Sequence, residues 1–271
     1  KANYDSLPAS TAFLPQITIR NIPGAGNSTV VFGTERSRQA NQLNVETLTS
    51  NLNFNYFVGD HELKFGLDYE KNDVYNLFLQ DVFGNYTIDY NNFVNPALNA
   101  GTLPYAFYNF QRPVVGSTLD NVAAVFDTAS LGLMAQDTWA IDSNWTLTYG
   151  FRVDRNMVGG VPAENTRFRS DFGIDNRNTI DGNMTFQPRL GFNYTFDSER
   201  RMQLRGGVGK FLGSAPGVWV SNSFSNPGVG VDSYSLSNGV GVVVDAANPF
   251  VPGVGGVASR QVNSLSSDFE Q

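Results

Sequence analysis

The chain has 271 residues, a formal net charge of −7 and no cysteine. The acidic balance argues against nucleic acid as a partner, because phosphate binding needs a basic face. The lack of cysteine excludes a disulfide scaffold, thiol catalysis and a cysteine-based zinc site. Aromatic residues make up 13% of the sequence and charged residues only 16%, which predicts a β-rich protein with much apolar surface to place.

No run of the sequence approaches the roughly 18 consecutive apolar residues that a membrane-spanning helix needs. This observation excludes helical spans only. A membrane β-barrel crosses with segments of about 10 residues of alternating hydrophobicity, which give a much weaker signal. Alternation of period two is therefore the relevant pattern, because successive side chains of a pleated strand point to opposite faces.

The N-terminal part is rich in proline and glycine, and the first clear hairpin follows it. Residues 1–28 are expected to be loop with a short strand at 16–20, and residues 29–33 are expected to end a strand. The hairpin covers about 43–70 and turns at 58–60. Its second arm alternates cleanly, and the apolar face of that arm consists of Leu63, Phe65, Leu67 and Tyr69.

Residues 71–127 lack clean periodicity and hold many asparagine, proline and aromatic residues. They are expected to form a long loop, and a connection of this length without secondary structure is usually functional or a sign of a wrong assignment. Exposed aromatic rings mark interaction surfaces and suit sugars, peptides or siderophore rings. The alternative is that the rings pack the loop against itself. The candidate ligand-binding residues are Tyr86, Tyr90, Tyr105, Phe107, Tyr108, Phe110 and Arg112.

The clearest alternation lies in a second hairpin over about 130–156, with short polar residues at 142–144 that supply turn chemistry. The polar face of its second arm includes Arg152 and Asp154. The other face of this arm is wholly apolar and consists of Trp145, Leu147, Tyr149, Phe151 and Val153. Residues 155–184 are expected to form another long loop.

A third hairpin covers about 185–213 and turns at 197–200. The last part of the chain, residues 213–271, is rich in glycine, serine and valine and is expected to be loop with a short strand at 240–244. All three hairpins thus have very short turns at one end and long connections at the other. Bacterial outer-membrane barrels have this asymmetry, with periplasmic turns and extracellular loops, whereas a soluble sandwich tends to have moderate loops at both ends.

The pattern predicts an all-β fold, an antiparallel up-and-down transmembrane β-barrel segment. Aromatic residues close to the short turns are expected at the membrane interface, and these are Tyr56, Phe57, Trp139, Trp145 and Phe196. A charge on the lipid face costs about 2–4 kcal/mol at the bilayer midplane. Charged residues of the polar faces are therefore expected to face the lumen, where structural ion pairing is favoured over a substrate path: Arg152, Asp154, Arg189 and Arg205.

Two of the hairpins resemble hairpins of TonB-dependent outer-membrane receptors, and the strand HELKFGLDYE at residues 61–70 resembles another of their strands. Residues 131–154, LGLMAQDTWAIDSNWTLTYGFRVD, resemble their "Y-x-Q-D-x-W … N-L-x-L-x-x-G-x-R-x-D" hairpin. Residues 186–211, FQPRLGFNYTFDSERRMQLRGGVGKF, resemble their "P-R-x-G-x-x-Y … L-R-x-G-x-G-x-F" hairpin. The sequence of these segments is especially similar to that of the Oar-like branch, although Met134 stands where an aromatic residue is common.

The resemblance implies a plugged barrel of roughly 22 strands. The six confident strands would then be part of that barrel, and the plug and C-terminal strands are expected to lie outside this chain. The implied role is movement of a bulky substrate across the bacterial outer membrane. The implied partners are outer-membrane lipid, the remainder of the barrel and plug, the TonB complex through a missing N-terminal part, and an unknown substrate.

No catalytic residue, metal ligand or cofactor is predicted, and the chain is expected not to be an enzyme. The segment 205–210, RGGVGK, lacks the spacing of a phosphate-binding loop. His61, the single histidine, is expected to be a solvated turn residue. Two other classes stay open: a surface-exposed all-β adhesin or binding module without transport, and a β-rich hydrolase that uses a carboxylate pair.

Overall fold

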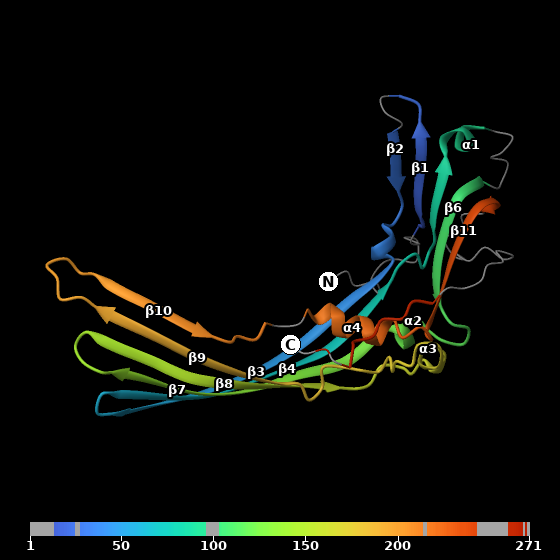
Figure 1. Cartoon of the computed structure of the whole chain (residues 1–271). Helices are drawn as coiled ribbons and strands as arrows, with labels where there is room; N and C mark the ends of the chain where they lie inside the picture. Colours follow the sequence, from blue (N-terminus) through green and yellow to red (C-terminus); the bar gives the residue numbers. More distant parts are fainter. Residues whose placement is uncertain are drawn as a thin grey trace.

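The computed structural model describes residues 14–24, 28–95, 103–213, 216–242, 260–267 and 269. The strands form two open sheets, one of six strands and one of five (Figure 1). No helix in these ranges is long and apolar enough to cross a membrane. Within the same ranges the helices are α1 (Tyr90–Val94), α2 (Leu119–Val122), α3 (Thr166–Phe172) and α4 (Gly217–Ser225), and a 3-10 turn lies at Arg36–Arg38.

The six-stranded sheet contains the three predicted hairpins, in the order β10-β9-β8-β7-β4-β3, and each neighbouring pair is antiparallel. Its strands are β3 (Ala40–Val58), β4 (His61–Leu79), β7 (Ala124–Ala140), β8 (Trp145–Gly159), β9 (Met184–Thr195) and β10 (Gln203–Gly209). The first hairpin is longer than predicted, since β4 continues to Leu79. The sheet is therefore up-and-down, interrupted only by the excursion between β4 and β7.

The short turns form where the sequence predicts them. Gly59 has a φ of 55°, which lets the chain reverse between β3 and β4. Between β7 and β8 the Asp142 carboxylate accepts hydrogen bonds from the backbone N–H groups of Asn144 and Trp145 at 2.8 and 2.7 Å. The Asn144 amide in turn donates to the carbonyl oxygen of Thr195 at 2.8 Å, which ties this turn to the next one.

The register gathers the apolar sets of all six strands on one face. Phe54 is paired with Phe65, Phe65 with Ala135 and Ala135 with Phe151. Directly paired residues of neighbouring strands share a face. The other members of the face follow from the same pairing and include Leu52, Tyr56, Leu67, Leu133, Tyr149, Val153, Phe186, Leu190 and Leu204.

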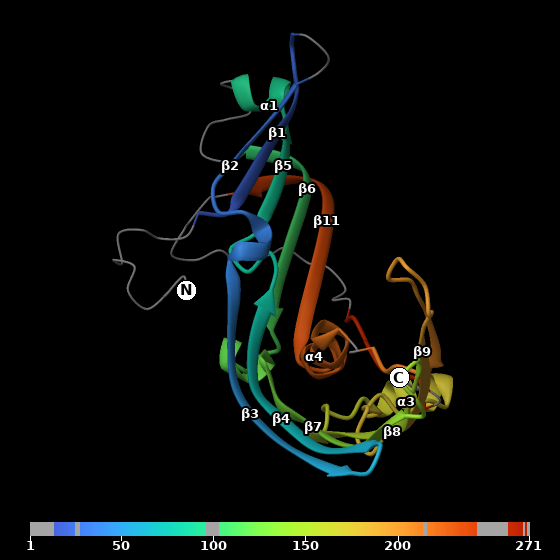
Figure 2. The same ribbon diagram turned by 90° about the vertical axis from the view of Figure 1, so that its left-hand side faces the viewer.

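Figure 2 shows that the sheet bends into an arc, with α4 inside it. The Asn76 amide, on the polar face of β4, donates to the Ser221 hydroxyl of α4 at 2.7 Å. The polar face is therefore the concave face of the sheet, and the apolar face is the convex one. The large apolar side chains of the convex face are exposed, for example Leu52 at 67% and Phe54 at 60%.

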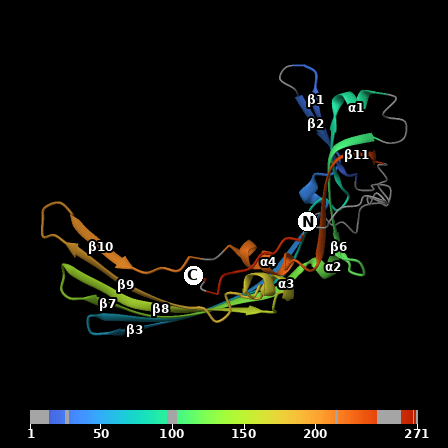
Figure 3. The ribbon, with the colours of Figure 1, turned by 45° about the vertical axis from the view of Figure 1, so that its right-hand side comes forward.

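A second sheet lies at the end of the strands away from the short turns (Figure 1, Figure 3). Its order is β11-β6-β5-β1-β2, and only the β1–β5 pair is parallel. Its strands are β1 (Gln16–Ile22), β2 (Ser28–Phe32), β5 (Asn85–Asp89), β6 (Leu103–Pro113) and β11 (Val231–Val242). The sequence indicated β1 and β2, but it assigned the stretches that hold β5, β6 and most of β11 to long loops.

The alternation of β6 is hidden because aromatic rings occupy both of its faces. Tyr108 and Phe110 are buried with Tyr86 and Ile88 in the core of the second sheet, whereas Phe107 on the other face is 46% exposed. A strand with rings on both faces gives no polar–apolar period to read.

The junction between the two sheets is tied by buried polar groups. The Arg36 guanidinium pairs with the Asp81 carboxylate at 2.6 Å, and Asp81 is almost fully buried. The buried Gln39 amide donates to the carbonyl oxygen of Gly84 at 3.0 Å and accepts from the N–H of Phe83 at 2.7 Å. These contacts join the start of β3 to the segment between β4 and β5.

Candidate functional site

A cavity of about 710 Å³ lies on the concave face, between the sheet and α4. The strands supply polar side chains to it. Helix α4 and the parts of β3, β4 and β7 that lie away from the short turns supply apolar ones. The residues that line it include Leu43, Val45, Glu70, Asn72, Val74, Phe126, Thr128, Ser130, Arg152, Asp154, Gln187, Val218 and Val220.

Helix α4 is held over the sheet by apolar packing. Its Phe224 ring stacks on Phe126 of β7 with centroids 4.7 Å apart. Its Val220 is buried in a cluster with Ala124, Phe126 and Ile180. The sequence GVWVSNSFS has no charged residue, and the sequence analysis placed it in a loop. The helix depends on contacts with strands that are far away in the chain, such as Asn76 of β4 and Phe126 of β7.

The floor of the cavity is an ion-pair network that four strands share. The Arg152 guanidinium donates to the Asp154 carboxylate at 2.7 Å and also pairs with Asp68 of β4. The Asn51 amide of β3 donates to Asp68 at 2.7 Å. On β9, the Gln187 amide donates to Asp154, and both of these side chains are more than nine-tenths buried. The network is therefore satisfied internally.

Gly132 makes room for this network on β7. Its Cα is paired with Asp68 on one side and with Asp154 on the other. A Cβ at this position would overlap the Arg152 guanidinium and lie 2.6 Å from Oδ1 of Asp154. The absence of a side chain is what lets the guanidinium lie across the sheet.

The structure places all four of the charged residues predicted to face the lumen on the concave face. Arg152 and Asp154 form the network just described. The Arg189 guanidinium lies over the Phe211 ring, 5.8 Å from its centroid. Arg205 lines a shallower hollow of about 460 Å³ together with Thr148 of β8.

Four of the five predicted interface aromatics lie in contact with other rings or on the convex face near the short turns. The Trp139 ring stacks on the His61 ring, with centroids 5.3 Å apart. The centroids of the Trp145 and Tyr194 rings are 4.7 Å apart, and the Tyr194 ring meets the Phe196 ring edge-on. Tyr56 shares the convex row of Leu63. Phe57 is on the opposite parity and lies on the concave face.

Close to the short turns, an acidic residue that was not predicted, Asp137, lies among the apolar side chains of the convex face. Asp137 shares the row of Leu63 and Tyr149. Its Oδ2 accepts from the Tyr149 hydroxyl at 2.7 Å and lies 2.7 Å from Nδ1 of His61. His61 is therefore a partner of Asp137, in place of the solvated turn residue that was expected. The sequence contains a signal for this pairing, because Asp137 alternates with Leu133 and so falls on the apolar face of its strand.

The aromatic segment predicted to bind a ligand is part of the second sheet. Tyr86 stacks on Tyr108 at 4.4 Å, and Arg112 lies over the Tyr234 ring. With Phe110 buried as well, these rings pack against one another, while Phe107 stays exposed below the Arg20 guanidinium. Tyr90 begins α1 and is half-buried, and the Tyr105 side chain lies outside the described part. Ligand binding by this segment stays a prediction.

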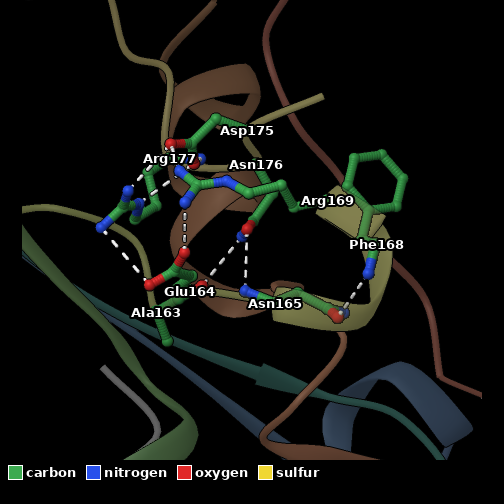
Figure 4. Close-up of polar contacts among 8 residues, drawn as sticks. All are labelled: Ala163, Glu164, Asn165, Phe168, Arg169, Asp175, Asn176 and Arg177. Atoms are coloured by element: carbon green, nitrogen blue, oxygen red, sulfur yellow. Dashed lines mark hydrogen bonds and ion pairs between the residues drawn. The ribbon is translucent and has the colours of Figure 1, made fainter. Parts of the chain in front are cut away.

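A cluster of four charges orders the connection between β8 and β9 (Figure 4). Arg177 pairs with Asp175 at 2.8 Å and with Glu164 at 3.6 Å, and Arg169 pairs with the same two carboxylates. Beneath them the fully buried Asn176 donates to the carbonyl oxygen of Ala163 at 2.8 Å. The two guanidinium groups, Arg177 first, hold the pKa of Asp175 well below its usual value.

The part of the chain that the structure describes contains no group of three or more histidine, aspartate or glutamate side chains placed to hold a metal ion. The site is thus a cavity with a charged floor and apolar walls. Such an arrangement can bind a molecule.

An antiparallel up-and-down sheet with an apolar convex face and a polar concave face is the wall of a membrane β-barrel. A family model described as an outer membrane beta barrel domain matches residues 3–270. The chain belongs to this family, and its location is the bacterial outer membrane. No curated protein and no solved structure matched the chain in the other two comparisons.

Proposed function

We propose that the chain is part of the barrel of a TonB-dependent outer-membrane receptor of the Oar-like branch, which moves a bulky substrate across the outer membrane. The observation that carries this proposal is the division of the six-stranded sheet into two faces. One face is continuously apolar, and the other holds a satisfied ion network and a cavity of about 710 Å³. A barrel with such a wall presents a polar interior through which a substrate can pass.

The partners follow from the same division. Outer-membrane lipid covers the convex face. The free edges of β3 and β10 pair with the remainder of the barrel, because unpaired backbone groups are not tolerated in hydrocarbon. The plug lies against the concave face, and the TonB complex engages a segment outside this chain. The proposal assigns no reaction, cofactor or nucleic acid to the chain.

The test compares three strains: the wild type, a strain that lacks this protein and a strain that lacks TonB. Each strain is grown on a panel of bulky nutrients, each supplied in turn as the limiting source. We expect at least one nutrient on which both mutants fail while the wild type grows. A panel on which the two mutants never share a defect would contradict the receptor assignment.

A second candidate function is surface binding without transport, as in an adhesin. The five-stranded sheet favours it, because this sheet stands beyond the membrane strands and exposes the apolar edge strand β2, with Val31 at 57%. An adhesin predicts that intact cells lacking the protein attach less well to surfaces while nutrient uptake stays normal. Normal attachment combined with lost uptake would rule this candidate out.

A further inference from the structure

We propose that the cavity beneath α4 binds a small amphipathic molecule that carries one cationic group. The inference deepens the proposed function, since it names the class of molecule that the concave face accepts. It rests on that function only for the transport step, because binding to the cavity can be measured without transport.

The size and the walls of the cavity suit a small molecule with an apolar body. Ligand pockets have volumes of about 300–1,000 Å³ and mostly apolar linings with a few polar groups. The cavity, at about 710 Å³, falls within that range. Its upper wall is apolar and is formed by Leu43, Val45, Val74, Phe126 and Val220, from three strands and α4.

The charge of the floor selects a cation. Arg152 is the one cationic side chain among the described lining residues, and it is already engaged by Asp154 and Asp68. The third carboxylate, Glu70, accepts from the Asn72 amide at 2.9 Å, and within the described ranges no lysine or arginine lies at ion-pair distance from it. The lining therefore contains two carboxylates, Asp154 and Glu70, and one guanidinium, which Asp68 outside the lining also pairs with.

Neutral hydrogen-bonding groups surround the Glu70 carboxylate. Ser130 is the residue directly paired with Glu70 on the concave face, and Asn156 is paired with Ser130 on the next strand. All three line the cavity. An ammonium group placed here would pair with the carboxylate and would have hydroxyl and amide oxygens within its row to take its remaining N–H bonds.

An anion fits this floor poorly. The N-terminus of α4 contributes Gly217 and Val218 to the lining, and a helix N-terminus carries about half a positive charge at most. This partial charge is smaller than the excess of carboxylates. A carboxylate or phosphate ligand would therefore lie against Glu70 without a free guanidinium to pair with.

The test measures binding to the full-length protein in detergent by calorimetry, with three probes of equal chain length: octylamine, octanol and octanoate. Heats of transfer into empty micelles are subtracted. We expect octylamine to bind about tenfold more tightly than octanol, and octanoate to bind most weakly. Octanoate that binds as tightly as octylamine would overturn the proposal, and this comparison needs no variant.

Two variants locate the binding. Glu70→Gln is expected to reduce octylamine affinity about tenfold and to leave octanol affinity unchanged. Glu62→Gln is the matched control, because Glu62 lies on the same strand and face but outside the cavity lining. Val218→Trp, at a half-exposed lining position of α4, is expected to abolish binding of all three probes. Unchanged octylamine binding in folded Glu70→Gln or Val218→Trp protein contradicts the site.

The binding experiment and the growth comparison of the three strains together separate this inference from the proposed function. One outcome is that octylamine binding depends on Glu70 while the strain without this protein and the strain without TonB never share a growth defect. This outcome supports the site and counts against transport. A shared growth defect without octylamine binding supports transport and counts against the site.

Discussion

Gly132 is the residue on which the packing of the concave face depends most closely. The Arg152 guanidinium occupies the space that a side chain would fill. We predict that Gly132→Ala lowers the free energy of unfolding by about 1–3 kcal/mol, because the guanidinium must leave its two carboxylates or the strands must separate. Equilibrium unfolding of the protein in detergent, followed by heat-modifiable gel mobility, measures the change.

The matched control is Gly191→Ala on β9. A Cβ at Gly191 would meet its nearest neighbour, the carbonyl oxygen of Gly206, at 3.7 Å, an ordinary contact distance. This variant is expected to unfold like the wild type. Equal losses in the two variants would show that any β-carbon on this face is costly, which would remove the special role of Gly132.

Asp175 gives the connection between β8 and β9 a defined pH dependence. Its pKa is lower in the folded protein than the usual 3.8, first because Arg177 donates to it and then because Arg169 does. The charged form therefore stabilises the connection at every pH above about 4. This stabilisation is lost as the pH falls through the lowered pKa of the folded state.

We predict that the protection of α3 amides from hydrogen exchange, corrected for intrinsic rates, is constant from pH 8 to pH 5 and falls only in strong acid. Asp175→Asn should reduce the protection already at pH 7 and remove its acid dependence. Asp171→Asn, which alters an exposed pair with Arg167, should behave like the wild type. Acid-dependent protection that persists in Asp175→Asn would assign the effect to another carboxylate.

At the scale of the element, β8 assigns its two faces to different surroundings. Phe151 lies on the convex face and is 44% exposed, whereas Thr148 lies on the opposite, concave face of the same strand. We predict that Phe151→Arg costs about 2–4 kcal/mol of stability in a bilayer, because a guanidinium on the lipid face near the midplane is poorly solvated. Thr148→Arg should cost less than about 1 kcal/mol, since it points to the lumen.

Unfolding of both variants in lipid vesicles measures these costs. A similar penalty for the two substitutions would mean that both faces of β8 have the same surroundings, which a barrel wall does not permit.

The sequence predicted the elements whose side chains alternate and missed those whose side chains do not. The hairpins of β3–β4, β7–β8 and β9–β10 have one polar and one apolar parity, so strand identity, turn position and face could be derived from residue types. The second sheet was missed because β6 has rings on both faces. Helix α4 and the cavity were missed because they depend on contacts such as Asn76–Ser221, which no local pattern encodes.

At the scale of the whole molecule, the long strands connect a membrane part to an outer part. A barrel strand needs about 9–11 residues to cross the hydrocarbon. Strands β3 and β4 have 19 residues each. On β4 the convex face changes from Tyr69 to Lys71, which pairs with Asp73 at 2.8 Å. The strands therefore continue past the apolar zone and hold the five-stranded sheet beyond it.

The central claim is that the six-stranded sheet is a barrel wall with its short turns in the periplasm. The chain has no cysteine, so a single introduced thiol is unique within it. The measurement uses three variants of the full-length protein on cells: Asp171→Cys in α3, Ser198→Cys in the turn between β9 and β10, and Leu133→Cys on the convex face. Each variant is exposed to a bulky, membrane-impermeant maleimide before and after the outer membrane is permeabilised.

The account predicts that Asp171→Cys reacts on intact cells, that Ser198→Cys reacts only after permeabilisation, and that Leu133→Cys stays unreactive in both conditions. Reaction of Ser198→Cys on intact cells, or reaction of Leu133→Cys as fast as that of Asp171→Cys, would contradict it.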